Sequence, residues 1–355
     1  MSERIVVYGA GAIGGQVGAR MHAAGHDVTI VEPWEPQLRA INSGGLTIHD
    51  EATGVSEHFA PPAIAPDDLA SLGDPVDLLF LAVKSFDTMQ ALETVLPHLA
   101  PDALVVSMQN SNNEEWVAPV VGNERMVGGV ILINGVLLEP GHVTLTSSVS
   151  RASASSHAMP GVYVGEYLAE AGPNAALVAS LLNSVWPAQV VDDLMHERWA
   201  KLAANTMINT VSAITGLRSA EALSTASVRK LMIALAAESL RVAEAEGHPL
   251  ETLLGDYAAT DIYEGALGRS DAVDDGLASR AGLVSAGATT SMLQDVLRKR
   301  QTEVDFFSGL IARKGAAYTI ETPFCVASTE MVHRIERGLA ARLANVDEVF
   351  RLVGD

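Results

Sequence analysis

The sequence predicts an α/β chain in which a mostly parallel sheet, with helices on both faces, precedes an all-helical region. Apolar, β-branched runs alternate with helical patterns over the first 135 residues, the arrangement that builds such a sheet. A glycine-rich turn follows the first of these runs directly, and beyond about residue 190 long helical patterns take over. We therefore expect two domains, 1–190 and 191–355, since 355 residues are enough to bury two cores.

The sheet is expected to begin with a β-α-β unit. RIVVYG (4–9) has the composition of a buried strand, AGAIGGQVGARMHAAG (10–25) that of a helix, and HDVTIVE (26–32) that of a second strand. The alternation continues with strands at 76–83, 103–109 and 126–135 and helices at 85–99 and 112–120.

Two further extended segments follow within residues 136–170. They are EPGHVTLTS (139–147) and GVYVGEY (161–167), and the loop SSVSRASASSHAMPG lies between them. We expect both strands to be appended to the same sheet.

The C-terminal region is predicted to be helical throughout its core. The stretch 247–287 is polar and spaced by glycines, so we expect it to form an excursion between the core helices. The core helices are expected at 194–213, 219–247, 288–316 and 326–347.

Charge and composition exclude several classes of function. The chain has 23 basic and 43 acidic residues, a formal net charge of −20, which disfavours binding to nucleic acid or to an anionic membrane. No uncharged apolar run reaches the ~20 residues of a membrane-spanning helix. The single cysteine, Cys325, excludes an intramolecular disulfide, and no Cys/His cluster has metal-ligand spacing. We expect a cytoplasmic protein without a metal site.

The glycine turn predicts a dinucleotide site. Gly9, Gly11 and Gly14 form a GxGxxG motif, with Ala12 and Ile13 inside it, directly after a strand and at the start of a helix. The first glycine permits the tight turn, the second lets the backbone approach a pyrophosphate, and the third lets the helix pack closely on the strand. This is the fingerprint of a Rossmann-type domain, and we expect all five residues to contact the cofactor.

The end of the second predicted strand bears on the choice of cofactor. Glu32 stands there, 18 residues after Gly14, where a carboxylate can accept hydrogen bonds from a ribose diol and would repel a 2′-phosphate. Arg39, seven residues later, could still serve a phosphate. We therefore expect NAD, with NADP as the alternative.

A row of polar residues interrupts the apolar helix predicted after residue 194. Lys201, Asn205 and Asn209 are spaced by four, so they share one stripe of the helix. A buried, hydrogen-bonded network would account for such a row, and so would a polar row that lines a cleft.

Five segments, in order along nearly the whole chain, make the sequence resemble the ketopantoate reductase (2-dehydropantoate 2-reductase) family. The resemblance implies an N-terminal Rossmann-type domain, a helical C-terminal domain and an active site in the cleft between them. The segments are GAGAIGG (9–15), LAVKSFDT (81–88), SMQNSNNEE (107–115), WAKLAANTMINTVSAITGL (199–217) and TSMLQDVLRKRQTEVDFFSG (290–309).

The resemblance also implies roles for single residues on the catalytic side. Lys201 corresponds to the catalytic lysine, and Glu303 to the glutamate beside that lysine and the cofactor. Asn110 corresponds to the asparagine near the nicotinamide and the substrate, and Lys84 to a lysine on the cofactor side. On position alone, Asn110 could instead cap a loop, and Glu303 could be a solvated helix residue.

The remaining matches concern the substrate. Asn205 and Asn209 correspond to substrate-binding amides, and Ser291 to the serine that meets the substrate carboxylate. Without the resemblance, Ser291 could simply cap a helix that starts at residue 292. The chain departs from the family pattern at QNSNNEE, where a glycine usually follows the asparagine, at Glu32, and in the added length of 247–287.

These observations together predict a nicotinamide-dependent enzyme that reduces a 2-oxo acid to the 2-hydroxy acid, with Lys201 as the general acid. One alternative is an NAD-dependent dehydrogenase of a different D-2-hydroxy acid, and another is a noncatalytic NAD-binding regulator. An opine-type dehydrogenase shares the domain plan but matches the motifs less well. Homodimerisation through the apolar helices is expected.

Overall fold

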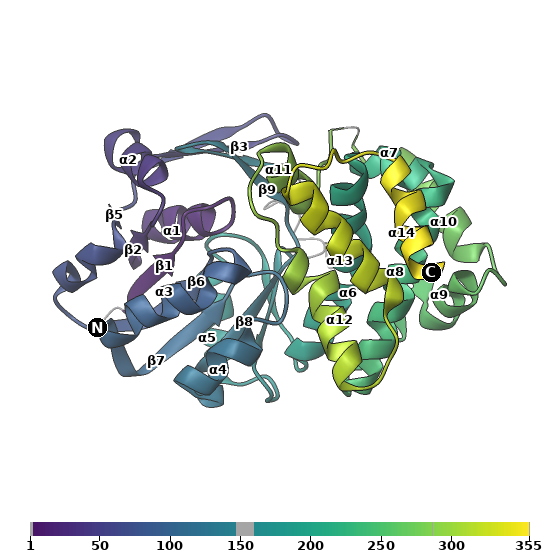
Figure 1. Ribbon diagram of the computed structural model, residues 1–355. Helices are drawn as coiled ribbons and strands as arrows, with labels where there is room; N and C mark the ends of the chain where they lie inside the picture. The colour runs from purple at the N-terminus through teal and green to yellow at the C-terminus, as the bar shows by residue number, and fades with distance from the viewer. Residues whose placement is uncertain (1–2, 147–159, 286, 355) are drawn as a thin grey trace. The chain divides into compact units, whose positions relative to one another are not determined.

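The computed structural model describes residues 3–146, 160–285 and 287–354. The loop expected at SSVSRASASSHAMPG lies almost entirely outside these residues. The chain forms two compact units, which divide between Glu197 and Arg198. Unit 1 contains the strands of the large sheet, and unit 2 consists mainly of helices (Figure 1).

The main sheet of unit 1 has eight strands in the order β12-β11-β8-β7-β6-β1-β2-β5. Its pairs are parallel except for β11 against β8. The central strands are buried apolar runs, as expected of a sheet covered on both faces. The strands are β1 Arg4–Tyr8, β2 Asp27–Val31, β5 Ala63–Ile64, β6 Val76–Leu81, β7 Leu99–Ser107, β8 Met126–Ile131, β11 Val162–Glu166 and β12 Ala188–Val190.

Helices pack against this sheet in two groups. Helix α1 packs against β1 and β2 and touches α5, whereas α3 packs against β6 and α4. The predicted Rossmann-type order of strands and helices is therefore confirmed. The helices are α1 Gly14–Ala23, α2 Glu35–Gly44, α3 Thr88–Val95, α4 Glu114–Val121 and α5 Pro173–Leu182.

Unit 1 also contains a second sheet that the sequence analysis did not anticipate. Its four strands run in the order β4-β3-β10-β9, with bounds Ser56–Phe59, Leu46–Asp50, His142–Leu145 and Gly135–Glu139. The expectation that EPGHVTLTS joins the main sheet is wrong, because β10 pairs with β3 and β9 instead. The partner β3 lies about a hundred residues earlier, and an alternating pattern cannot say which of two sheets a strand will join.

Unit 2 is built around α8, which packs against α7, α9, α10, α12, α13 and α14. None of the helices among residues 3–146, 160–285 and 287–354 has the length and apolar character needed to cross a bilayer. The helices are α6 Leu194–Thr215, α7 Ser219–Ser224, α8 Ala226–Ala245, α9 Ala259–Ala266, α10 Ala272–Arg280, α11 Ser291–Leu297, α12 Ser308–Ala317, α13 Pro323–Glu336 and α14 Ala344–Gly354.

Three predicted long helices are interrupted in the structure. The helix expected at 219–247 divides at Thr225, which is extended. The one expected at 288–316 divides into α11 and α12, with Lys299 in the left-handed region at φ 54°. The one expected at 326–347 divides into α13 and α14, and Gly338 between them has a positive φ of 112°. Apolar periodicity resumed after each break, so the pattern alone predicted continuous helices.

Within the predicted excursion at 247–287, the described residues form regular elements that pack against α8. The excursion contains a short hairpin, β13 Thr252–Leu253 with β14 Tyr257–Ala258, followed by α9 and α10. Arg229 on α8 forms a two-pronged ion pair with Asp274 on α10, at 2.9 and 2.7 Å. Short 3-10 helices occur at η1 Pro66–Leu72, η2 Ser85–Asp87, η3 Leu96–His98, η4 Asn123–Arg125, η5 Ala281–Leu283 and η6 Val304–Phe306.

Candidate active site

The glycine turn joins β1 to α1 and has the geometry that a dinucleotide requires. Gly9 lies in the left-handed region, at φ 99°, and its N–H donates to Val31 O at 2.8 Å. A Cβ on Gly14 would collide with the Gly9 carbonyl, whereas a Cβ on Gly11 would meet nothing within 4 Å. Gly11 therefore faces open space, where a pyrophosphate can approach the backbone. Ala12 and Ile13 complete the turn, and Ile13 is the N-cap residue of α1.

Glu32 follows β2 directly and is held by two backbone amides. Its carboxylate accepts hydrogen bonds from Ala10 N at 2.5 Å and from Trp34 N at 2.6 Å. Burial raises the pKa of Glu32, and the hydrogen bonds from the two backbone amides oppose that rise. Each carboxylate oxygen can still accept another hydrogen bond, so the group can also meet a ribose hydroxyl. Arg39 instead forms an exposed ion pair with Glu35 at 3.1 Å.

Lys84 and Asn110 lie after the carboxyl ends of the adjacent strands β6 and β7, where open α/β sheets bind ligands. Lys84 precedes η2 in an extended conformation. The carbonyl of Asn110 accepts hydrogen bonds from the side chains of Ser85 and Asn113. Ser111 then occupies the left-handed region at φ 69°, which explains why a glycine is common at this point of the motif.

A network of amide and hydroxyl groups, which the sequence analysis missed, ties these two loops together. Gln109 Nε2 donates to Val83 O at 3.0 Å and to Thr88 Oγ1 at 2.6 Å. Asn113 Nδ2 donates to Ser85 Oγ at 3.2 Å. The only available signal was the density of short polar residues after two neighbouring strands, which does not identify partners.

The polar row on α6 forms a hydrogen-bonded chain with α11. Asn209 Nδ2 donates to Asn205 Oδ1 at 3.1 Å, as expected of residues one turn apart. Ser291 Oγ donates to Asn209 Oδ1 at 3.2 Å. The structure thus brings together the three residues that the sequence analysis associated with the substrate, although Ser291 is 82 residues from Asn209.

The alternative explanation for Ser291 does not hold. Helix α11 begins at Ser291 itself, and its N-cap residue is Thr290, whose side chain accepts a hydrogen bond from Leu293 N at 3.2 Å. The hydroxyl of Ser291 is therefore not the helix cap.

Lys201 has the electrostatic surroundings of an acid that works near neutral pH. Burial, together with the nearby positive charge of Arg198, lowers its pKa to about 7, although the negative charge of Glu303 acts in the opposite direction. Arg198, only 2% exposed, was not singled out from the sequence. An ammonium group with such a pKa can lose its proton readily at physiological pH.

Glu303 is not the solvated helix residue that its position alone suggested. It is 4% exposed and lies between α11 and α12, just before η6. A buried carboxylate requires compensating partners, and the attraction between Glu303 and Lys201 supplies one.

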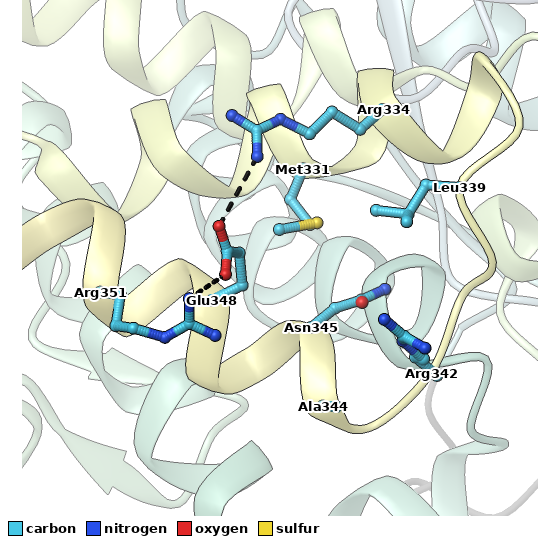
Figure 2. A pocket seen from close by; sticks show the side chains of 8 residues that line it. All are labelled: Met331, Arg334, Leu339, Arg342, Ala344, Asn345, Glu348 and Arg351. Carbon is cyan, nitrogen blue, oxygen red and sulfur yellow. Dashed lines mark ion pairs between the residues drawn. The ribbon is translucent and has the colours of Figure 1, made fainter.

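A cavity of about 440 Å³ lies elsewhere in unit 2, between α13 and α14 (Figure 2). It contains none of the residues singled out from the sequence. Its lining residues are Met331, Arg334, Leu339, Arg342, Ala344, Asn345, Glu348 and Arg351.

Comparison with known proteins gives full-length relatives. The chain is 29% identical over 341 residues to a 2-dehydropantoate 2-reductase of Archaeoglobus fulgidus, covering 95% of this chain and 99% of that protein. It shares its fold with a D-mandelate dehydrogenase solved with NADH and anilino(oxo)acetate, at a TM-score of 0.76 and 24% identity over 94% and 98% of the two chains.

A PanE/ApbA family ketopantoate reductase from Ralstonia eutropha superimposes with a TM-score of 0.74 at 25% identity, covering 94% of this chain and 98% of that one. The family model for ketopantoate reductase PanE/ApbA matches residues 5–153, and the model for its C-terminal part matches residues 193–336. The first match contains the glycine turn and Asn110, and the second contains Lys201, Ser291 and Glu303. Because these two matches together cover more than half of the chain, the chain belongs to the ketopantoate reductase family.

Proposed function

We propose that the protein is an NAD(P)-dependent oxidoreductase that reduces a 2-oxo acid to the corresponding 2-hydroxy acid. One observation carries the proposal: Lys201, with a pKa of about 7, stands on the same helix stripe as Asn205 and Asn209, which continue into Ser291. This stripe combines a proton donor with neutral groups that can bind an oxygen-rich substrate.

Residues 1–190 would bind the dinucleotide, and residues 191–355 the substrate. The open face of Gly11 and the fixed carboxylate of Glu32 fit a pyrophosphate and a ribose diol. When bound, the nicotinamide supplies the hydride. Ala12, Ile13 and Gly14 would complete the pyrophosphate site, and Lys84 would contact a cofactor oxygen.

The choice of NAD over NADP rests on Glu32. Its carboxylate would repel a 2′-phosphate, and Arg39 is engaged with Glu35 instead of being directed at that position. A Glu32→Gln variant is expected to lower the ratio of kcat/KM for NADH to that for NADPH about tenfold, the effect of ~1.4 kcal/mol. An unchanged ratio would show that other residues select the cofactor.

Each polar residue of the site would have one task. Lys201 would donate its proton to the oxygen of the substrate carbonyl as negative charge develops there. Glu303 would hold the ammonium group and border the cofactor, and Asn110 would orient the nicotinamide and the substrate. Asn205, Asn209 and Ser291 would bind the hydroxyl and carboxylate oxygens of the substrate.

The substrate is proposed to be 2-dehydropantoate or a similar branched 2-oxo acid, in line with the names of the curated relatives. A different D-2-hydroxy acid is the second candidate, since one protein of the same fold is a D-mandelate dehydrogenase. The comparisons give no support to a noncatalytic NAD-binding regulator.

The test is an initial-rate assay with 2-dehydropantoate and a panel of aromatic and aliphatic 2-oxo acids, with NADH and NADPH in parallel. Lys201→Ala should abolish most of the turnover while NADH binding, followed by fluorescence titration, is retained. Turnover that survives in the variant would contradict the role of Lys201. If no 2-oxo acid is turned over although NADH binds, the proposed reaction is wrong.

Two further expectations belong to the same proposal. We propose a homodimer in the cytoplasm, and one relative of the same fold is described as a dimeric ketopantoate reductase from Staphylococcus aureus. Sedimentation equilibrium would give the mass in solution, and a monomer at micromolar concentration would contradict the dimer.

A further inference from the structure

Side chains bind both backbone polar groups of Ala10, which lies between the first two glycines of the turn. Its N–H donates to Glu32, and its carbonyl accepts a hydrogen bond from Gln37 Nε2 at 2.8 Å. Ala10 and Gln37 are both fully buried. Gln37 lies in the first turn of α2, so the helix that follows β2 reaches back to the glycine turn.

The other end of the Gln37 amide reaches the second sheet. Gln37 Oε1 accepts a hydrogen bond from Gly141 N at 2.8 Å, and Gly141 O accepts one from Thr47 N at 2.8 Å. Gly141 lies in the turn between β9 and β10, at φ 80°. One side chain therefore connects the glycine turn of the main sheet to the β9–β10 hairpin of the second sheet.

The hairpin approaches the glycine turn at a second point. A Cβ on Gly135, the first residue of β9, would come within 3.3 Å of Gln16 Nε2 and 3.5 Å of Ala12 Cβ. Gln16 in turn donates to Ala12 O at 2.6 Å. The start of β9 thus adjoins the segment that carries Gly11, and the turn between β9 and β10 reaches that segment through Gln37.

Only an amide of this length can make both contacts of Gln37. A glutamate keeps an acceptor for Gly141 N but has no donor for Ala10 O when ionised, and a methionine of similar shape makes neither contact. If these contacts are lost, the buried carbonyl of Ala10 and the buried N–H of Gly141 lose their hydrogen-bond partner. The resulting loss of stability falls on the glycine turn and its surroundings.

We infer that Gln37 is a positioning residue for the dinucleotide turn and that the β9–β10 hairpin is its support. Gln37 fixes the Ala10 peptide, and thereby the orientation of the backbone at Gly11, without touching the cofactor. The inference rests on the proposed function, because it assumes that the turn binds a pyrophosphate.

The first experiment compares Gln37→Met and Gln37→Glu with wild type in titrations with NADH and with ADP-ribose, which carries the pyrophosphate but no nicotinamide. We expect both dissociation constants to rise about tenfold in both variants, the effect of one lost hydrogen bond. At saturating NADH, kcat and the KM of the 2-oxo acid should stay within about twofold.

General destabilisation must be separated from an effect on the turn. Val164→Ala removes buried methyl groups from β11, four strands away from β1 in the same sheet. At a similar loss of Tm, this control should bind NADH and ADP-ribose like the wild type. If it weakens binding as much as Gln37→Met does, the positioning role is refuted.

Hydrogen exchange supplies a measurement that needs no cofactor. In Gln37→Met, the amides of residues 9–14 and 135–145 should exchange about tenfold faster than in wild type, while those of β7 and β8 remain unchanged. Unchanged exchange in either segment would overturn the inference.

The binding data separate failure of the inference from failure of the proposed function. If the wild-type protein binds neither NADH nor NADPH, the proposed function fails, and the role of Gln37 fails with it. If the wild-type protein binds the cofactor and both Gln37 variants bind it equally well, only the inference is refuted.

Discussion

The side-chain nitrogen of Asn209 lies 3.1 Å from the side-chain oxygen of Asn205, one turn earlier on α6. Because this amide donates to Asn205, the oxygen of Asn209 is oriented towards α11, where it accepts the hydroxyl of Ser291. The orientation of Asn209 therefore fixes the direction of two neighbouring groups at once, which makes it the pivotal member of the row.

Asn209→Leu should raise the KM of the 2-oxo acid about 10- to 100-fold and lower kcat less, since it removes a ground-state contact and leaves Asn205 and Ser291 without their shared partner. Initial rates at saturating NADH measure both constants. Asn42→Ala, an exposed change on α2, is the matched control and should have no effect. A KM within twofold of wild type would exclude Asn209 from substrate binding.

The pKa of about 7 at Lys201 predicts opposite pH dependences for the two directions of the reaction. Reduction needs the protonated lysine, so kcat/KM for the 2-oxo acid should fall as the pH rises above about 7. Oxidation of the 2-hydroxy acid needs the neutral amine, so its rate should rise through the same range. Rate profiles between pH 5.5 and 9.5 that show no inflection in either direction would contradict Lys201 as the proton donor.

The same group should make stability depend on pH. The pKa of Lys201 is lowered on folding, so between pH 7 and 10.5 the unfolded chain binds more protons than the folded one, and stability rises with pH in that window. The stability of Lys201→Met relative to wild type should therefore be highest below pH 7 and should fall by at most about 5 kcal/mol between pH 7 and pH 10.5. Denaturant melts at pH 6 and 9.5 measure it, and an equal difference at both values would refute the lowered pKa.

Ser111→Gly should stabilise the protein by up to about 1 kcal/mol, because a serine at φ 69° is strained where a glycine is not. Ser279→Gly on α10, where the backbone is helical, is the matched control and should destabilise by about 0.5–1 kcal/mol. Denaturant melts of both variants give the two values. A loss of stability in Ser111→Gly would show that the serine side chain outweighs the backbone strain.

The β-α-β unit could be predicted because its signals are local. The strand at 4–8, the glycines that follow it and the strand at 27–31 all lie within about thirty residues, so no distant contact was needed to identify them. The membership of β10 in a second sheet could not be predicted, since its pairing with β3 depends on contacts across about a hundred residues. The left-handed turn at Lys299 carries no glycine to announce it.

In the candidate site, too, local relationships could be predicted from the sequence and distant ones could not. The spacing of Lys201, Asn205 and Asn209 placed them on one stripe, because helix geometry is local. Ser291 and Glu303 entered only through the resemblance to a family, and on position alone Glu303 would have been assigned to solvent. Gln37 was overlooked, because a glutamine on a short helix gives no sign that its amide joins a glycine turn to a second sheet.

The length of the polar row on α6 can be compared with the size of a 2-oxo acid. With a rise of 1.5 Å per residue, the backbones of Lys201 and Asn209 stand about 12 Å apart, whereas the carbonyl and carboxylate carbons of a 2-oxo acid are directly bonded. The row is therefore longer than the reacting end of such a molecule. If the row binds the substrate as proposed, 2-oxo acids with a polar group at the far end would fill it, and shorter ones would leave part of it to water.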